Sequence, residues 1–293
     1  MNTPMVNSPH NLGMGADDLV AGAVELASPP EIYLRLTELL DDPAHTALGL
    51  ADVLEKDPGM SARLLRLVNS AFYGFPSQID SVRRAVTIVG MRELRDLVLA
   101  TAVLDMFSGL PNELVNMQTF WENSLRCAVV AKLVAEAQES QQQVESLFVC
   151  GLLHEIGHLV MYSKLPELAR EAWLRHRYGA VELHKAEQQV FGFDYAAVGG
   201  ALMRGWRMPL VLQETVEFHL EPERARDYGP QVNWVRLARR VASAGTFDPR
   251  VAAQVVPGDD PGWRQAGIAG EDAMADLLVR AADQYQAALA LVQ

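Results

Sequence analysis

The sequence predicts an all-α protein, organised as a two-lobed helical bundle. Apolar residues recur at three- and four-residue steps through most of the 293 residues, which is the spacing of half-buried helices. No stretch alternates apolar and polar residues for long enough to predict a strand. Proline and glycine interrupt the helical pattern at short intervals, so most connecting loops are expected to be short.

An N-terminal helical lobe is expected over residues 17–110, after a flexible segment over residues 1–16 that is rich in Asn, Pro and Gly. Its helices are predicted over residues 31–40, 47–55, 60–72 and 81–107. Asp57 and Pro58 separate the second helix from the third, and Gly90 allows a bend in the fourth. Asn69 and Ser70 follow the apolar part of the third helix, where their side chains can satisfy the last carbonyls or cap the next element.

A second helical lobe is expected over residues 111–244. Its helices are predicted over residues 120–137, 145–162, 165–178, 181–191, 195–204 and 209–219. Gly199, Gly200 and Ala201 give one of these helices a face of small residues, against which another helix can pack closely.

The C-terminal part of the chain divides into a loop and a helix. Residues 245–270 are crowded with Pro, Gly and Asp and predict a long surface loop. A helix is predicted over residues 271–293, where Glu271 and Asp272 place negative charge at its start, as the helix dipole favours. Its apolar stripe is expected to dock on either lobe of the protein's own core in preference to forming a dimer seam, which leaves a homodimer open.

Composition restricts the classes of function. Thirty-seven acidic residues against 25 basic ones give a formal charge of -12, which opposes binding to a nucleic acid. Cys127 and Cys150 lie in apolar segments without C-x-x-C spacing, as buried reduced thiols of a cytosolic protein do. The most apolar stretches fall short of about 18 uninterrupted apolar residues, so no membrane span is expected. We therefore expect a cytoplasmic protein.

The sharpest short motif is H-E-x-x-H at His154-Glu155-x-x-His158, predicted to lie inside one helix. Two histidines four residues apart on a helix can bind one zinc ion while the glutamate polarises its water, as in a zinc metalloprotease. The extended metzincin motif is missing, and nothing singles out Glu182 or Glu187 as a third ligand. Because apolar residues surround nearly the whole helix, histidines hydrogen-bonded in a core are the favoured interpretation.

A longer pattern holds many positions in register from residue 29 to about residue 222. Its first half comprises Leu50-Ala51, Asp57-Pro58, the run Leu64-Leu65-Arg66-Leu67-Val68-Asn69-Ser70-Ala71, Ile79, Ser81, Ala85 and Val89-Gly90. Its second half comprises Phe120-Trp121, Ser124, the run from Gly151 to Gly157, Glu187, Gly192, Asp194, Gly199, Trp206, Pro209 and His219. With these residues the sequence resembles the HDOD family, an all-helical relative of the HD-type metal-dependent phosphohydrolases found in bacterial signalling proteins. The resemblance implies an HD-like architecture for residues 111–244.

The same resemblance implies that most metal ligands of the HD type are lost. The first histidine position holds Asn123, and the adjacent His-Asp pair is His154-Glu155. Three further ligand positions hold Tyr195, Leu220 and Arg239, whereas His219 persists. His154, Glu155 and His219 are thus the only vestigial metal ligands, no cofactor is expected, and Arg239 is the expected ionic partner of Glu155, since an isolated buried carboxylate is costly.

A group of arginines in the N-terminal lobe offers another candidate site. Arg83, Arg84, Arg92 and Arg95 could receive a phosphate or an acidic partner segment. The alternative is that they form a solvated helix face, which such spacing more often indicates.

Three functions follow from these patterns. The leading one is a non-catalytic signal-transduction module that binds a protein partner, or a small signalling molecule, in bacterial regulation. The second is a metal-dependent phosphohydrolase with an altered ligand set, and the third is the zinc metalloprotease. Neither a nucleic acid nor a membrane is an expected partner.

Overall fold

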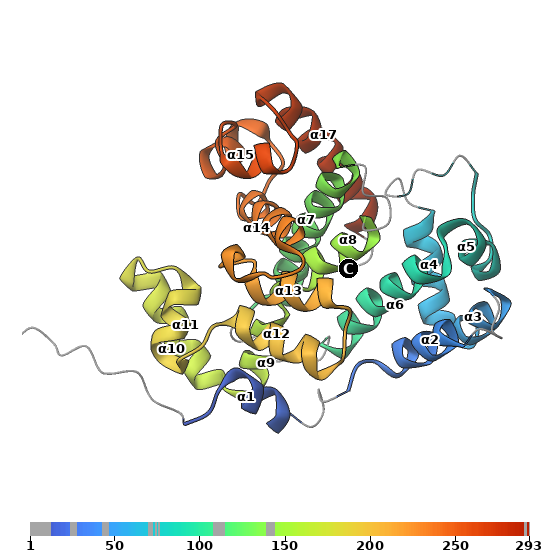
Figure 1. Cartoon of the computed structure of the whole chain (residues 1–293), viewed down its shortest axis with the longest axis horizontal. Helices are drawn as coiled ribbons and strands as arrows, with labels where there is room; N and C mark the ends of the chain where they lie inside the picture. The colour runs from blue at the N-terminus through green and yellow to red at the C-terminus, as the bar shows by residue number, and fades with distance from the viewer. Residues whose placement is uncertain are drawn as a thin grey trace, which may run out of the picture.

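The computed structural model describes residues 13–23, 28–42, 47–69, 73, 75, 77–107, 115–138, 144–289 and 292. Throughout these residues the secondary structure is helical, and they contain no strand. The predicted all-α, two-lobed bundle is confirmed (Figure 1). The flexible segment predicted over residues 1–16 falls mostly outside the described residues.

The described residues of the N-terminal lobe form five helices. They are α2 (Glu31–Asp41), α3 (Ala47–Leu54), α4 (Pro58–Val68), α5 (Val82–Val89) and α6 (Met91–Met106). Asp57 caps α4 by accepting a hydrogen bond from the Met60 amide at 2.9 Å, and Pro58 takes the first helical position. Gly90, with φ of 104°, separates α5 from α6 in a backbone conformation that favours glycine, and so turns the predicted bend into a break.

Asn69 closes the end of α4 with three hydrogen bonds. Its Nδ2 donates to the carbonyls of Leu65 at 2.8 Å and Ile79 at 2.7 Å, and its Oδ1 accepts from the Ile79 amide at 2.6 Å. The predicted role of Asn69 at the last carbonyls is therefore confirmed, whereas Ser70 lies outside the described residues.

Replacing Asn69 with alanine is expected to lower the free energy of unfolding by about 1–2 kcal/mol, because backbone groups of Leu65 and Ile79 lose their partner. Urea denaturation followed by circular dichroism measures the change. Asn116, which caps another helix with a single hydrogen bond to the Thr119 amide, is the comparison: Asn116→Ala should cost less. A cost for Asn69→Ala no larger than that for Asn116→Ala would contradict the structural role.

The second lobe is built around one long helix. The lobe comprises α7 (Met117–Ala137), which is the long helix, α8 (Val144–Leu153), α9 (Ile156–Lys164), α10 (Pro166–Gly179), α11 (Leu183–Phe191), α12 (Tyr195–Gly205), α13 (Leu210–Phe218), the 3-10 helix η3 (Pro222–Arg224) and α14 (Gly229–Ala242). Helix α7 contacts α8, α14 and α17 (Glu271–Ala288), while α12 lies between α9 and α13. Helix α14 was absent from the predicted helices.

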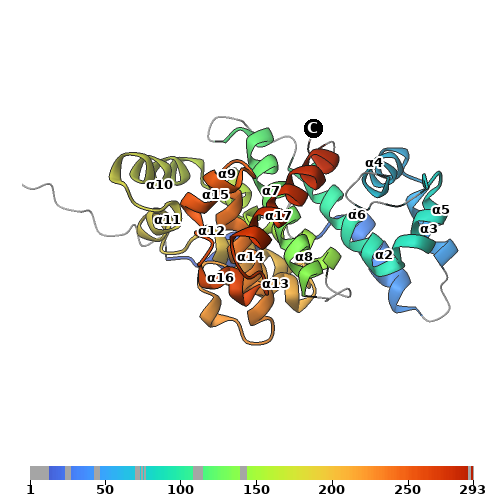
Figure 2. The same cartoon turned by 90° about the horizontal axis from the view of Figure 1, so that it is seen from above.

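Helices α6 and α8 join the two lobes (Figures 1 and 2). Asp96, on α6, is buried at this joint and accepts a hydrogen bond from Ser146 on α8 at 3.1 Å. Its other oxygen accepts two bonds from Arg95, at 2.8 and 3.0 Å. The buried carboxylate is therefore paired and hydrogen-bonded, as burial requires.

Three predictions about the elements are wrong. Residues 245–270 are not one long loop: they form α15 (Pro249–Val255) and α16 (Pro261–Gln265), which are held by the fully buried Trp263. Helix α1 (Ala16–Gly22) belongs with the second lobe, since it packs on α12 and pairs Asp17 with Arg204 at 2.9 Å. The helix predicted over residues 145–162 is broken, because α8 ends at Leu153 and α9 begins at Ile156.

The last helix packs on the second lobe, a choice that the sequence left open. Helix α17 packs on α7, where Arg280 pairs with Glu136 at 2.7 Å and Arg126 lies over the Tyr285 ring at 4.9 Å. The apolar stripe of α17 is buried in the protein's own core, as expected.

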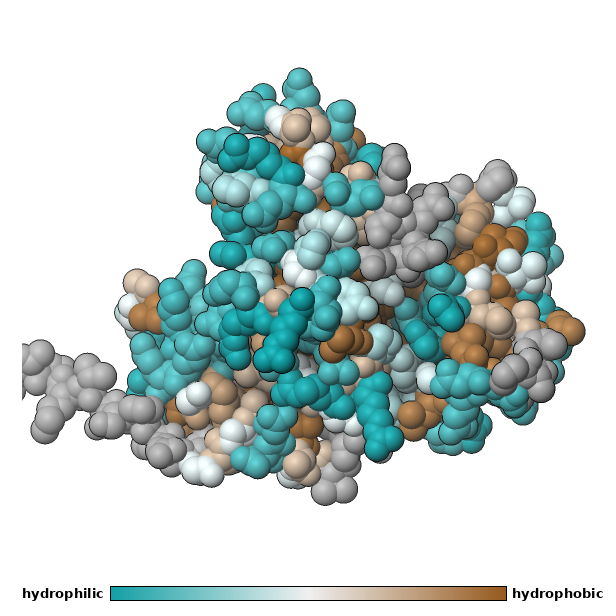
Figure 3. Space-filling view, in the orientation of Figure 1, coloured by the Kyte–Doolittle hydropathy of each residue, from teal (hydrophilic) through white to brown (hydrophobic). Residues whose placement is uncertain are grey.

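One described segment, residues 146–164, is long and apolar enough by composition to cross a membrane. Most of it is buried inside the protein, as a core helix is. Apolar surface gathers instead on the N-terminal lobe (Figure 3). The exposed large apolar side chains of that lobe are Leu34, Leu48, Ile88 and Met91.

Candidate functional site

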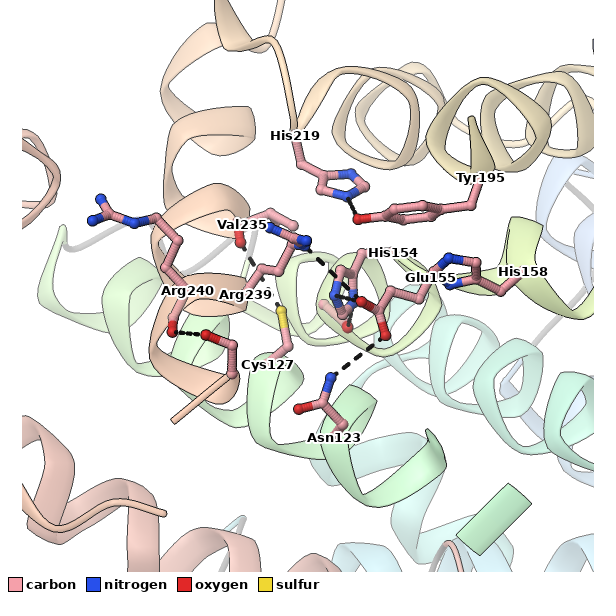
Figure 4. Close-up of polar contacts among 12 residues, drawn as sticks. Asn123, Cys127, His154, Glu155, His158, Tyr195, His219, Val235, Arg239 and Arg240 are labelled. Carbon is pink, nitrogen blue, oxygen red and sulfur yellow. Dashed lines mark hydrogen bonds and ion pairs between the residues drawn. The ribbon is translucent and has the colours of Figure 1, made fainter. Parts of the chain in front are cut away.

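Three of the four residues at the degenerate ligand positions, Asn123, Tyr195 and Arg239, converge with His219 on one place in the second lobe (Figure 4). Asn123 comes from α7, Tyr195 and His219 from α12 and the end of α13, and Arg239 from α14. They surround His154 and Glu155, which occupy the break between α8 and α9.

Two glycines allow the helices to approach each other around this break. A Cβ at Gly151 would lie 2.6 Å from the Ala128 Cα on α7, and a Cβ at Gly157 would lie 2.7 Å from the Gly199 amide nitrogen on α12. Real Cβ atoms do not come this close to backbone, so only glycine permits these contacts. His154 and Glu155 are thereby held at the meeting point of α7, α9 and α12.

Glu155 lies at the centre of the site and is partly buried, with 16% of its side chain exposed. Its Oε2 accepts a hydrogen bond from Asn123 Nδ2 at 3.4 Å, and its Oε1 lies 4.0 Å from Arg239 Nε. The expected pairing of Glu155 with Arg239 is confirmed. Burial would raise the pKa of Glu155, but the electrostatic effects of His154, His158 and Arg239, with the hydrogen bond from Asn123, outweigh it and lower the pKa.

His154 is fully buried, and its two ring nitrogens have different environments. Its Nδ1–H donates to the Gly151 carbonyl at 2.7 Å, which leaves Nε2 as an acceptor 3.7 Å from Glu155 Oε1. No hydrogen-bond partner reaches Nε2 among the described residues. Burial lowers the pKa of His154 despite the nearby Glu155 carboxylate, so the ring is neutral.

His219 is held by Tyr195, which the family resemblance places at a ligand-histidine position. Its Nδ1–H donates to the carbonyls of Thr215 and Val216, at 3.2 and 3.0 Å, and its Nε2 accepts from the Tyr195 hydroxyl at 2.9 Å. Burial lowers the pKa of His219 well below its usual value, with further contributions from His154 and Arg239. A metal would need the lone pair of His219 Nε2, and this nitrogen already accepts a hydrogen bond from the Tyr195 hydroxyl.

His158, the second histidine of H-E-x-x-H, uses different partners from His154. Its Nε2 lies 2.9 Å from Glu187 Oε1, and its ring stacks on Tyr195 with 4.0 Å between the centroids. The other Glu187 oxygen accepts the Tyr195 amide at 3.0 Å. Burial would lower the pKa of His158, but the Glu187 carboxylate outweighs it and raises the pKa.

The H-E-x-x-H motif is therefore not placed for a zinc protease. Its two histidines lie on either side of a helix break, and Glu187, one of the two glutamates weighed as a third ligand, is a buried ionic partner of His158. Sequence reasoning missed this pair, because only the packing of α9 on α12 and of α11 beside them brings residues 158, 187 and 195 together.

The residues present do not fit the divalent metal that HD-type hydrolases hold. Arg239 places a cation beside Glu155, Asn123 directs its amide N–H groups at the same carboxylate, and the Nε2 of His219 is bonded to Tyr195. Among the described residues, no three side chains of His, Cys, Asp or Glu are arranged to hold one metal ion. A divalent cation needs more negative and neutral donors than this site offers.

Leu220 lies apart from this centre. It lines a pocket of about 320 Å³ between α11, α12 and α13, together with Phe193, Glu217 and Arg224. The pocket is bordered by more carboxylates than arginines.

The four arginines of the N-terminal lobe are largely engaged with acidic residues. Arg83 pairs with Asp52 and Glu55, Arg84 lies 4.0 Å from Asp80, and Arg95 binds the buried Asp96. Arg92 is exposed. These pairings favour a solvated ionic face over an anion site.

Comparisons with known proteins agree with this architecture. The sequence matches the HDOD domain family over residues 26–222, more than half of the chain. An uncharacterized protein of Treponema pallidum (strain Nichols) is 24% identical over 210 residues, which are 71% of this chain and 40% of that relative. The chain thus matches less than half the length of this curated relative.

Three solved structures share the fold. An HDOD domain protein with unknown function from Geobacter sulfurreducens has a TM-score of 0.73 at 24% identity, with 94% of this chain and 97% of that chain covered. A protein from Shewanella amazonensis SB2B, named "Putative phosphohydrolase", has a TM-score of 0.74 at 24% identity, with 99% and 100% covered. A protein from Marinobacter aquaeolei VT8, named "Putative signal transduction protein", has a TM-score of 0.69 at 18% identity, with 100% and 68% covered.

Proposed function

The chain belongs to the HDOD domain family, and from this we propose that it is a non-catalytic signal-transduction module that works by binding another protein. We further propose that it acts in the cytoplasm, where its two buried thiols, Cys127 and Cys150, stay reduced.

One observation carries the proposal: Arg239, which the family resemblance places at a metal-binding aspartate position of HD-type hydrolases, lies 4.0 Å from Glu155. The guanidinium supplies the positive charge that the carboxylate requires, and it cannot be deprotonated in a protein. A divalent cation at Glu155 would therefore face both a fixed positive charge and the loss of an ion pair. Without a metal-bound water, the phosphohydrolase mechanism lacks its nucleophile.

The experiment is elemental analysis of the purified chain, before and after incubation with Mn²⁺, Fe²⁺ or Mg²⁺, together with hydrolysis assays on phosphate mono- and diesters. We expect less than about a tenth of an equivalent of any metal and no hydrolysis above background, because the site lacks a ligand set. A full equivalent of metal with hydrolysis that disappears in His154→Ala would overturn the proposal.

A matched variant shows that the assay can detect a working site. Asn123→His, Glu155→Asp and Arg239→Asp together restore the ligand types of the HD pattern at positions that the structure brings together. This triple variant is expected to bind a divalent metal where the parent chain does not, and the single variant Arg239→Lys, which keeps the charge, is expected to bind none.

The second candidate is the metal-dependent phosphohydrolase with an altered ligand set, and one observation favours it. His154 Nδ1 is fixed by the Gly151 carbonyl, and its Nε2 is buried without a hydrogen-bond partner among the described residues. Metal-ligating histidines commonly have their other ring nitrogen fixed in this way. One such histidine is a single ligand, which is why we rank this function second.

The binding function is tested by cross-linking the full chain in cells and identifying which of its residues are joined to another protein. Reproducible cross-links from one surface to one partner would support a protein-binding module. Arg239→Ala, which leaves Glu155 without its cation, serves to ask whether that partner depends on the paired site.

A further inference from the structure

A pocket that the proposed function does not use lies between α14 and α16. Its volume is about 260 Å³. It is lined by Asn233, Arg236, Leu237 and Arg240 of α14 and by residues 260–262 and Gln265 around α16. The pocket exists because residues 245–270 fold into helices that cover α14.

The single carboxylate that lines the pocket is already fully engaged. Asp260 Oδ2 accepts from Arg240 Nη1 at 2.7 Å, and Asp260 Oδ1 accepts the Gly262 amide at 2.8 Å. Arg240 is anchored further by its bond to the Val255 carbonyl at 3.2 Å. Arg240 and Asp260 thus neutralise each other and form one wall of the pocket.

Arg236 lies one helical turn before Arg240 on α14 and lines the same pocket. It is exposed and has no hydrogen bond or ion pair with the part of the chain that the structure describes. The pocket therefore carries one positive charge more than it can balance.

We propose that this pocket binds a small phosphate-bearing ligand, with Arg236 as the main anchor of the phosphate. A guanidinium presents several N–H donors in a plane that matches phosphate oxygens. The amides of Asn233 and Gln265 add donors beside it, and Leu237 with Pro261 provides an apolar wall for the rest of the ligand. The small volume limits that remainder to a few carbon atoms.

The test is calorimetric titration of the full chain at low salt with three probes: inorganic phosphate, ribose 5-phosphate and ribose. Saturable binding of either phosphate-bearing probe, but not of ribose, is the expected result, and tighter binding of ribose 5-phosphate than of phosphate would assign the ligand as a phosphate ester. Binding of ribose at the same strength as ribose 5-phosphate, or no saturation by any probe, would overturn the proposal.

The decisive variant is Arg236→Ala, which we expect to weaken phosphate binding by about tenfold or more through the loss of a charge-assisted contact. Arg264→Ala is the matched control, because Arg264 is an exposed arginine of α16 that does not line the pocket. Equal weakening in both variants would show a general charge effect and sink the proposal. Arg240 is left intact, because it holds Asp260 in place.

Discussion

Gly157→Ala is expected to destabilise the protein by about 3 kcal/mol or more, or to prevent folding altogether. The added Cβ would overlap the Tyr195 carbonyl oxygen and lie 2.7 Å from the Gly199 amide nitrogen. Both obstacles are backbone of α12, so no side-chain rotation relieves the overlap, and α9 must move away from α12. Urea or thermal unfolding measures the loss.

The control is Gly205→Ala at the end of α12, where the nearest atom to an added Cβ is Val20 Cγ1, at 3.9 Å. This variant should be neutral or slightly stabilising, because alanine favours the helix over glycine. If Gly157→Ala proved as stable as Gly205→Ala, the close contact of α9 with α12 would be refuted. Any folded Gly157→Ala protein should also loosen the His158–Tyr195 stack, since its two rings come from these two helices.

The stability of the protein is expected to fall as the pH drops below about 6.5, by up to about 1.4 kcal/mol per pH unit for each of His154 and His219. Both have pKa values lowered by burial, so the unfolded chain takes up protons below pH 6.5 that the folded chain does not. The unfolded state is then favoured progressively with acidification. Denaturant titrations between pH 5 and pH 8 measure this slope.

His219→Asn is expected to reduce that acid slope, since it deletes one of the two fully buried rings whose pKa values are lowered. Identical slopes in the parent and the variant would show that His219 is protonated in the folded state, contrary to its bonds to the carbonyls and to Tyr195.

His158 should behave in the opposite way. Glu187 raises the pKa of His158. The stabilisation that this ion pair gives the folded state is therefore fully present below pH 6.5 and is lost as the pH rises through the folded-state pKa. His158→Gln should therefore reduce the loss of stability above pH 6.5 and leave the loss of stability below pH 6.5 unchanged. The parent chain should accordingly be most stable near pH 6.5.

Local sequence patterns were sufficient to predict most helices, because caps, prolines and apolar spacing act within a few residues. Asp57, Pro58 and Gly90 end or start helices where expected. The same reasoning failed for residues 249–255 and 261–265, whose short helices depend on burying Trp263, and for α14, which was not predicted. It also failed at residues 154 and 155, where an unbroken apolar pattern conceals a break.

The sequence by itself determined the helical class, the family pattern and which ligand types are replaced, since each of these is a matter of residue identity and spacing. Only the tertiary structure decided that Arg239 meets Glu155, that Tyr195 bonds His219 and that Glu187 pairs with His158. These partners are separated by 24 to 84 residues. Contacts over such separations depend on how the helices pack. Close approaches between helices, such as that at Gly157, control this packing, and local periodicity does not encode it.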